Sequence, residues 1–322
     1  MVSFQDYHKN NKLNTMKKQL IILFCITVVL ASCKTIPQYK VDQIKEETVK
    51  KHLYTLASDE MEGRGSGTPG IEKAAQYIEG EFERIGLTKF ETLPTYRQNF
   101  EAKGMKLFNI IGVLEGKSKK DEYVVVSAHY DHLGIRKKEG QIDSIYNGAD
   151  DDASGTSAVL ALAEYFKKKN NNERTIIFIA FTAEEKGLLG SNYFGKGVNA
   201  SKYVAGINIE MIGKESSFGP KTAWLTGFER SDFGTIIQKN LEGTGYVLHP
   251  DPYPKFNLFF RSDNASLARL GIPSHTFSTG PIDKDPHYHQ ASDEPETLDV
   301  STITETIRAI VETSKVSGSS EA

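Results

Sequence analysis

The stretch Ile176-Ile177-Phe178-Ile179-Ala180-Phe181-Thr182-Ala183-Glu184-Glu185 is a continuous apolar run that ends in two adjacent carboxylates. An apolar run of this length predicts a strand buried on both faces, as in a parallel sheet covered by helices. In open α/β sheets the ligand crevice lies just beyond the carboxyl ends of the strands. The stretch therefore predicts the fold class and a site at Glu184 and Glu185. The simpler alternative is a loop with two solvated glutamates.

Strands and helices alternate around this stretch. Strands are predicted at 123–128, 174–181, 203–209 and 274–278. Helical spacing of apolar residues predicts helices at 41–57, 71–85, 154–168, 188–194, 231–241, 265–270 and 301–315. This alternation indicates an α/β fold with a mostly parallel central sheet and helices on both faces. No second periodic block follows the leader, so residues 41–322 are expected to form a single domain.

The composition limits the kinds of site and partner that we expect for this chain. The chain has 322 residues, of which 39% are hydrophobic and 25% charged, with a net charge of −3 and no basic stripe for nucleic acid. We expect a monomer. The two cysteines, Cys25 and Cys33, both lie near the N-terminus, so the folded body has no disulfide and no thiolate ligand. A metal site in this body must be built from His, Asp and Glu.

The first 33 residues have the pattern of an export signal. Two lysines, Lys17 and Lys18, precede an apolar run at 20–30 that is short for a membrane span. The run ends in Leu30-Ala31-Ser32-Cys33, which resembles a bacterial lipobox, with an ordinary cleaved signal as the alternative. We predict a leader at 1–33, a tether at 34–40 and a lipid on Cys33. The protein would then be an exported bacterial lipoprotein of the periplasm or cell envelope, anchored to a membrane.

Histidines and acids follow the predicted strands. His129 and Asp131 come after 123–128, Glu184 and Glu185 after 174–181, and Glu210 directly after 203–209. Asp150, Asp151 and Asp152 open the helix at 154–168, and His287 and His289 lie near the end of the chain. Carboxylates that meet in one crevice repel one another without a counter-charge, which a divalent metal supplies. Imidazole and carboxylate ligands suit Zn²⁺ and, less specifically, Co²⁺ or Mn²⁺.

Six segments, in order, resemble the M28 family of di-zinc aminopeptidases. They are His129-x-Asp131, 148–155, 183–191, 208–213, Arg261-Ser262-Asp263 and Tyr288-His289. The resemblance covers roughly residues 50–300 and implies a three-layer zinc-peptidase sandwich that acts on peptides.

The resemblance also implies a role for each residue of the site. His129 and Glu210 would hold one zinc, Glu185 and His289 the other, and Asp151 would bridge both. Asp131 would accept the second ring N–H of His129. Glu184 would act as general base, and Tyr288 would stabilise the oxyanion. Arg261 would hold the peptide, and carboxylates near Glu210 would bind its α-amine.

Two residues depart from the family pattern. Glu210 stands where many members have Asp, and Asn264 stands where relatives often have His. Several choices also remain at the residue level. His289 is preferred to His287, and Asp151 to its two neighbours. His132 and His275 are expected to be structural. The aromatic loop at 253–260 either packs on the surface or lines the pocket.

Three alternative functions remain. A glutaminyl-cyclase-like acyltransferase would share the fold but use a single zinc, and a non-catalytic binding protein would have lost ligands. A glycosidase needs two carboxylates about 5 Å or more apart that face one bond. Successive residues of an extended segment point in opposite directions, so Glu184 and Glu185 make a poor glycosidase pair. Hydrolysis of N-terminal peptide bonds by an aminopeptidase or dipeptidase is the preferred interpretation.

Overall fold

The computed structural model describes residues 44–137, 139–140 and 142–314. All of these belong to one compact unit. The predicted leader, tether and Cys33 lie outside the described residues, so lipidation and export stay predictions. Within the described part of the chain, no helix is both long enough and apolar enough to cross a membrane.

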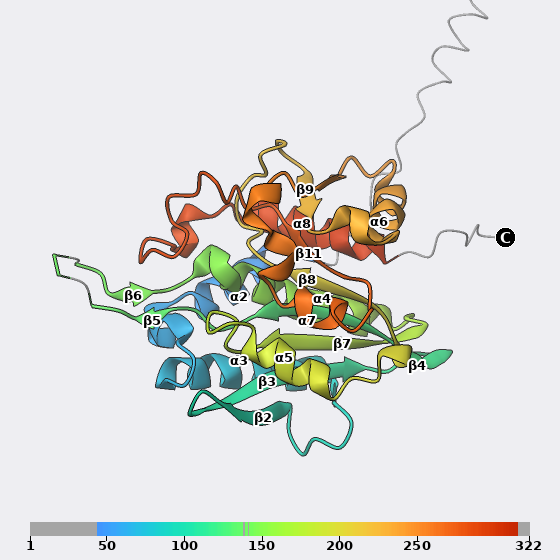
Figure 1. Ribbon diagram of the computed structural model, residues 1–322, viewed down its shortest axis with the longest axis horizontal. Helices are drawn as coiled ribbons and strands as arrows, with labels where there is room; N and C mark the ends of the chain where they lie inside the picture. Colours follow the sequence, from blue (N-terminus) through green and yellow to red (C-terminus); the bar gives the residue numbers. More distant parts are fainter. Residues whose placement is uncertain (1–43, 138, 141, 315–322) are drawn as a thin grey trace, which may run out of the picture. The chain divides into compact units, whose positions relative to one another are not determined.

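Nine strands of the described chain form one sheet (Figure 1). Their order is β1-β3-β7-β4-β8-β11-β9-β10, with β2 paired to β3 at one edge. The bounds are β1 Thr88–Lys89, β2 Arg97–Ala102, β3 Met105–Leu114, β4 Lys119–His129, β7 Arg174–Phe181, β8 Tyr203–Ile209, β9 Thr222–Leu225, β10 Val247–Pro250 and β11 Ser274–Ser278. A separate pair, β5 Gly134–Ile135 and β6 Ile145–Tyr146, is antiparallel.

The four central strands, β7, β4, β8 and β11, are parallel to one another. The prediction of a parallel sheet is confirmed there, while β3 runs antiparallel to β7 and β9 runs antiparallel to β11, so the sheet as a whole is mixed. β3 also runs antiparallel to β2, to which it is tightly connected through Lys103 and Gly104. Both residues have positive φ angles, 49° and 74°, as two-residue hairpin turns require.

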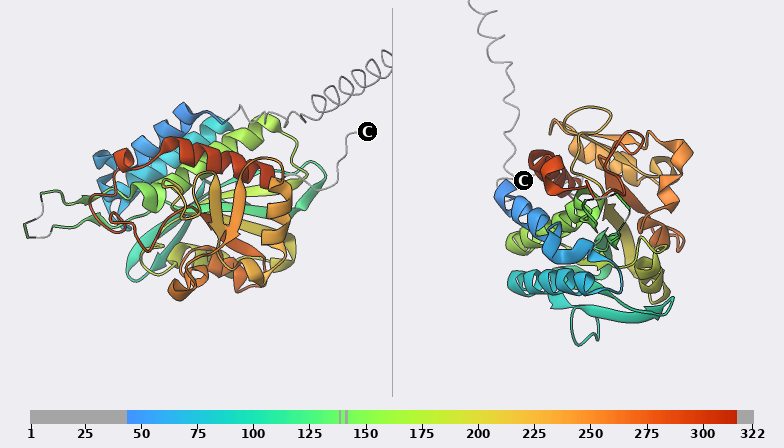
Figure 2. Two further views of the ribbon diagram at one scale, coloured as in Figure 1. Left: turned by 90° about the horizontal axis from the view of Figure 1, so that it is seen from above. Right: turned by 90° about the vertical axis from the view of Figure 1, so that its left-hand side faces the viewer.

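Helices cover both faces of the sheet (Figure 2). One layer holds α2, α3, α4 and α8, and the other holds α5 and α7, while α6 packs on α8 and β10. Their bounds are α2 Glu46–Leu56, α3 Pro69–Ile85, α4 Gly155–Lys169, α5 Leu189–Lys196, α6 Phe233–Leu241, α7 Asn264–Ala268 and α8 Val300–Thr313. The helices predicted from apolar spacing are therefore all present, with ends shifted by a few residues.

The stretch 176–185 forms the middle of this sandwich. Every residue of β7 from Thr175 to Phe181 is buried. Ile177, Ile179 and Phe181 pack in one apolar cluster with residues of β3 and β4. Because helices cover both faces of the strand, it can be apolar at every position rather than at alternate positions.

The predicted strands at 123–128, 174–181, 203–209 and 274–278 do not include β1, β2, β3, β9 or β10. Of these, β9 and β10 each have four residues, too few for a period-two pattern to stand out. The acidic segment before α4 also differs from a simple cap. Residues Ala149–Ser154 form an irregular helical turn in which all six residues are buried, so the three aspartates enter the interior rather than solvent.

Candidate metal centre

The carboxyl ends of β4, β7 and β8 meet at one edge of the sheet. His129 is the last residue of β4 and lies level with Phe181 at the end of β7. Ser127 of β4 pairs with Asn208 of β8, which puts Glu210 beyond the same edge. The register of the parallel strands thus brings together the residues that the sequence placed after them.

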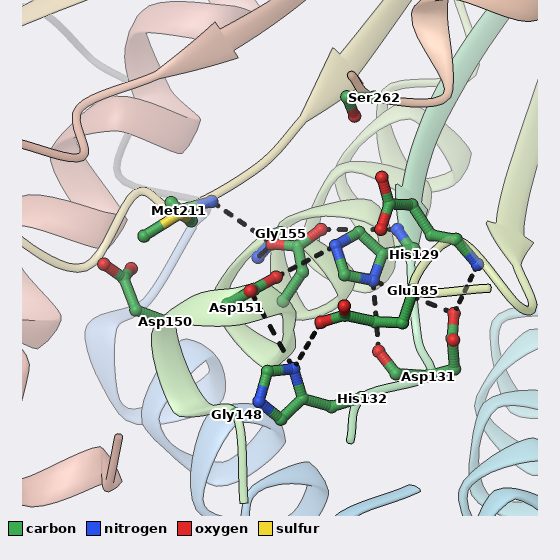
Figure 3. A network of polar contacts seen from close by, with 12 residues as sticks. His129, Asp131, His132, Gly148, Asp150, Asp151, Gly155, Glu185, Met211 and Ser262 are labelled. Carbon is green, nitrogen blue, oxygen red and sulfur yellow. Dashed lines mark hydrogen bonds and ion pairs between the residues drawn. The ribbon is translucent and has the colours of Figure 1, made fainter. Parts of the chain in front are cut away.

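A first group of possible ligands consists of His129, Asp151 and Glu210. One ligand atom from each lies within 4.8 Å of the others. His129 Nε2 is 3.1 Å from Asp151 Oδ1, and both side chains are buried (Figure 3). The structure brings these three predicted metal ligands together.

A second group forms on the other oxygen of Asp151. His289 Nε2 lies 3.2 Å from Asp151 Oδ2 and 3.2 Å from Glu185 Oε1. Asp151 is therefore shared by both groups, whereas His287 bonds Ser292 Oγ through Nδ1 and takes no part in either group. The choices of His289 over His287 and of Asp151 over its neighbours agree with this geometry.

His132, which we expect to be structural, lies among the possible ligands. Its Nδ1 lies 3.0 Å from Glu185 Oε1 and 3.9 Å from Asp151 Oδ2, and these three residues could hold an ion together (Figure 3). The segment after His129 folds back beside Arg64 and carries the ring under the site, which its place in the sequence did not indicate. His275 does behave as a core residue, since it bonds Thr226 O and Ser231 Oγ.

Buried polar atoms without hydrogen-bond partners among the described residues converge on these two groups. They include His129 Nε2, Glu185 Oε1 and Glu210 Oε2. Since buried polar groups are normally paired, atoms left unpaired at one place indicate a bound ion or solvent. The donors are two kinds of hard or borderline ligand, imidazole and carboxylate, with no thiolate. This donor set fits Zn²⁺.

The pKa values reflect crowded negative charge. Burial raises the pKa of the Glu184 carboxyl well above its usual value, and neighbouring carboxylates add to the effect. Burial likewise raises the pKa of Asp152. Burial would lower the pKa of His289, but its contacts with Asp151 and Glu185 outweigh this and raise it to about 10. Such a cluster lacks cations, which bound metal ions would supply.

Glu184 and Glu185 do not lie in an extended segment. Ala183 has a positive φ of 55°, and the amides of Gly187 and Leu188 both donate to Glu184 O, which closes a tight turn. Both glutamates line the same cavity of about 450 Å³. The extended segment on which the prediction of opposed side chains rests is therefore absent, because strand geometry ends at Phe181.

Asp131 does contact the His129 ring, but through its backbone oxygen rather than through the predicted carboxylate. His129 Nδ1 is 3.0 Å from the backbone oxygen of Asp131 and 3.8 Å from its carboxylate. That carboxylate instead accepts hydrogen bonds from Ser66 Oγ at 2.8 Å and from the backbone N–H of Glu184 at 3.0 Å. Asp131 thus orients the imidazole through its carbonyl and the turn that carries Glu184 through its side chain.

The aspartates beside Asp151 bond to backbone amides. Asp150 Oδ1 accepts from Gly213 N at 2.7 Å, and Asp152 Oδ1 accepts from Gly155 N at 2.9 Å. These contacts agree with the expected capping or supporting roles. The amide of Asp151 itself donates to Asp293 Oδ2 at 3.1 Å, so Asp293 orients the shared ligand.

Tyr288 and Arg261 lie at the open side of the cavity. The Tyr288 ring stacks on His289 with a centroid distance of 4.0 Å, and Arg261 Nη2 lies 3.5 Å from the Tyr288 hydroxyl. Leu258 and Phe260 line the cavity, so the loop at 253–260 contributes to the pocket. Burial and the nearby Asp151 raise the pKa of Tyr288, which keeps its hydroxyl protonated.

Sequence reasoning missed Arg64. It lies in a glycine-rich loop at 58–70, which lacks the GK[ST] ending of a phosphate loop and so predicts no site by itself. Its Arg64 is fully buried, and its guanidinium donates to the carbonyls of Leu56, Tyr130, Asn147 and Gly148. Two of these carbonyls flank site residues, since Tyr130 follows His129 and Gly148 precedes the aspartates. An arginine among glycines was the available signal.

Asp263 and Asn264 are also buried beside the site. Neither oxygen of Asp263 has a hydrogen-bond partner within the described residues, and burial raises its pKa to about 7. Asn264, the unexplained departure from the family pattern, donates to the carbonyls of Phe259 and Ser274 and accepts from Thr276 Oγ1. It therefore ties the start of α7 to β11.

The sequence has recognisable relatives. A probable leucine aminopeptidase of Trichophyton verrucosum is 30% identical over 283 residues, 83% of this chain and 70% of that protein. A probable zinc metalloprotease of Pyricularia oryzae is 30% identical over 171 residues, which cover 52% of this chain and 33% of that protein. The chain spans 33% and 42% of the length of two such metalloproteases, so it matches part of them.

Solved structures share the fold. A zinc aminopeptidase from Bacillus subtilis superposes with a TM-score of 0.68 at 17% identity, covering 83% of this chain and 95% of that one. A glutaminyl cyclase of Bacteroides thetaiotaomicron gives 0.66 at 20% identity, covering 84% and 97%. At these identities the likeness concerns the fold. The sequence of residues 109–314 matches the model of peptidase family M28. The chain therefore belongs to peptidase family M28.

Proposed function

We propose that this protein hydrolyses N-terminal peptide bonds as an aminopeptidase or dipeptidase that holds two zinc ions. The observation that carries the proposal is the position of Asp151. Its Oδ1 lies 3.1 Å from His129 Nε2, and its Oδ2 lies 3.2 Å from His289 Nε2. One carboxylate between two nitrogen donors is the arrangement expected of a bridging ligand in a two-metal hydrolase.

The residues divide between the two ions. His129, Glu210 and Asp151 would hold one, and Asp151, Glu185 and His289 the other. Zinc held by these residues would lower the pKa of water and polarise the substrate carbonyl. Glu210 stands where many relatives have Asp, and its side chain is one methylene longer. It extends from the end of β8 into the cavity and belongs to the first group.

Glu184 is the proposed general base. It lines the cavity with Asp151 and Glu185, and its backbone amide is held by the Asp131 carboxylate at 3.0 Å. It would take a proton from the attacking water and pass it to the leaving amine. Burial raises the pKa of this carboxyl, which makes it a stronger base.

Tyr288 and Arg261 would act on the substrate. The Tyr288 hydroxyl, kept protonated, would donate a hydrogen bond to the developing oxyanion. Arg261, exposed at the rim, would hold the peptide beside it. Carboxylates around Glu210 would bind the positive α-amine and so favour cleavage at the N-terminus.

The cavity also indicates a class of N-terminal residue. Its apolar lining includes Met211, Trp224, Leu258, Phe260 and Ile282. An apolar first side chain would bury its surface there, in line with relatives named as probable leucine aminopeptidases. We therefore propose peptides with an apolar first residue as substrates.

The test is Glu184→Gln. This variant should bind both metals as the unaltered protein does and lose about 10²- to 10⁴-fold in kcat, the usual contribution of a general base. Turnover on aminoacyl and dipeptide substrates, with metal content measured in parallel, checks the expectation. Normal turnover would remove Glu184 from its role, and loss of metal would show that it is a ligand instead.

The alternative is a single-zinc acyltransferase of the glutaminyl-cyclase type, whose fold is shared. The unpaired His129 Nε2 and Glu210 Oε2 favour a second metal and hence the hydrolase. One zinc per chain, together with cyclisation of N-terminal glutamine and no peptide cleavage, would favour the transferase.

A further inference from the structure

His132 is a buried histidine that has no role in the proposed reaction. Its side chain is fully inaccessible, and among the described residues neither ring nitrogen has a hydrogen bond. Nδ1 nevertheless lies 3.0 Å from Glu185 Oε1, an oxygen that also has no hydrogen-bond partner. Two polar atoms are thus in contact without being directed at each other.

His129 shows the same combination. Its Nε2 lies 3.1 Å from Asp151 Oδ1, yet it makes no hydrogen bond. Donors that surround a common ion point at the ion and not at one another, so short contacts without hydrogen-bond geometry are expected of metal ligands. His275, a core histidine, differs: both of its ring nitrogens lie 2.8 Å from hydrogen-bonding oxygens.

The distances around His132 fit one coordination sphere. With Zn–N and Zn–O bonds of about 2.0–2.1 Å, two donors to the same ion would lie no more than about 4 Å apart. His289 Nε2 is 3.2 Å from Asp151 Oδ2 and from Glu185 Oε1. His132 Nδ1 lies 3.0 Å from Glu185 Oε1 and 3.9 Å from Asp151 Oδ2, both within this limit, and these three residues form one group that could hold an ion.

The backbone holds the ring in this place. The amide of His132 donates to Arg64 O, and the ring packs over Gly148. Gly148 has a φ of 55°, and a Cβ there would lie 2.4 Å from His132 Cγ (Figure 3). Glycine at 148 therefore leaves the space that the imidazole fills beneath Asp151 and Glu185.

We propose that His132 is a fourth ligand of the Asp151–Glu185–His289 zinc site and binds through Nδ1. The inference rests on the proposed function, since it assumes that zinc occupies this group. It makes the two sites unequal, with three protein donors at the His129 site and four at the other. The four-donor site would then keep its zinc at lower free zinc concentrations, because imidazole adds a ligand that is already in position.

Two variants of the full-length protein test the proposal, His132→Ala and the more conservative His132→Asn. Zinc affinity is measured by competition with a chelator and zinc content by elemental analysis. The spectrum of Co²⁺-substituted protein reports the number of ligands. We expect both variants to lose at least about tenfold in affinity at one of the two sites, with a changed Co²⁺ spectrum. The 10- to 100-fold cost of losing a supporting residue sets the scale.

His52→Asn is the matched control. His52 is also buried, bonds Tyr77 through Nδ1 and belongs to neither ligand group. Its substitution should leave both affinities and the Co²⁺ spectrum unchanged. Thermal unfolding of each metal-free variant separates a lost ligand from a lost fold.

A measurement on the unaltered protein covers the case in which both His132 variants misfold. In ¹¹³Cd-substituted protein with ¹⁵N-labelled histidine, three histidines should show coupling to cadmium, one of them through Nδ1. Coupling to two histidines, or unchanged zinc affinity and Co²⁺ spectrum in folded His132→Asn, would overturn the proposal.

Failure of the proposed function has a different outcome. A protein that shows three coupled histidines but hydrolyses no peptide would retain His132 as a ligand and refute the peptidase. A protein that hydrolyses peptides with two zinc ions and shows two coupled histidines would retain the peptidase and refute the role of His132.

Discussion

The two ligand groups differ in the elements that carry them. In the His129–Asp151–Glu210 group, two of the three residues come from strand ends: His129 ends β4, and Glu210 follows β8. In the second group, His132, Glu185 and His289 all come from loops, and the His289 side chain is 37% exposed. Strand register positions the first group, whereas loops need supports of their own to position the second.

Buried polar contacts of this kind support Asp151, the ligand that both groups share, and the segment after His129. The Asp293 carboxylate accepts hydrogen bonds from the amides of Asp150 and Asp151, and the Arg64 guanidinium donates hydrogen bonds to the carbonyls of Tyr130 and Gly148. Each support lies far along the chain from the residue that it holds. A loop-borne metal site is thus positioned by side chains that are not ligands, as is usual for residues around metal ligands.

The largest effect is expected from Asp151→Asn, which breaks both groups at once. The amide keeps the shape but removes the charge that both sites share, so zinc content should fall below one per chain. Activity should fall by more than about 10³-fold, because several kcal/mol of metal-derived stabilisation is lost. Elemental analysis and peptidase assays check this. Retention of both metals would refute the sharing of Asp151.

Comparison of His129→Ala with His289→Ala tests the difference between the groups directly. Each should lose one zinc. In the metal-free protein, His129→Ala removes a fully buried partner of Asp151 and should cost about 3 kcal/mol of unfolding free energy. His289→Ala removes a partly exposed partner and should cost about 1 kcal/mol or less. Denaturant unfolding after chelation measures both, and equal costs would contradict the comparison.

Arg64→Lys should weaken both groups together. Lysine keeps the charge but cannot reach four carbonyls at once, since it lacks the planar fork of the guanidinium. Zinc affinity at both sites should fall by about 10- to 100-fold, the scale of residues that orient ligands. Chelator competition gives the two affinities. Loss at a single site would limit the support of Arg64 to that group.

His52 is a buried histidine outside both ligand groups, and its effect on stability serves as a reference. Burial lowers the pKa of His52 from 6.5 to about 4. Between these values the unfolded chain binds more protons than the folded one, so stability falls as the pH falls through this window. On going to about pH 5, the unaltered protein should lose up to about 2 kcal/mol more than His52→Gln. Urea unfolding of the metal-free proteins at several pH values measures the difference, which an unchanged pH profile would contradict.

The sequence predicted the strands and helices where the apolar pattern was long. β7, β8 and β11 have the predicted bounds, and the apolar run that marks β7 is buried on both faces of the sheet. Four-residue strands such as β9 carry too few positions for a pattern. The predicted ligands His129, Asp151, Glu185, Glu210 and His289 do converge, while their roles in metal binding and catalysis stay predictions.

By itself, the sequence determined the apolar strand at 174–181, the acids and histidines that follow the parallel strands, and the family to which they belong. The tertiary structure alone decided which atoms meet. Both Glu184 and Glu185 line one cavity, and the His129 ring contacts the backbone carbonyl of Asp131. Arg64 is buried beneath the loops, and His132 lies beside Glu185. Periodicity and spacing report which side of an element faces the core. Contacts between loops depend on long-range packing, which no local pattern encodes.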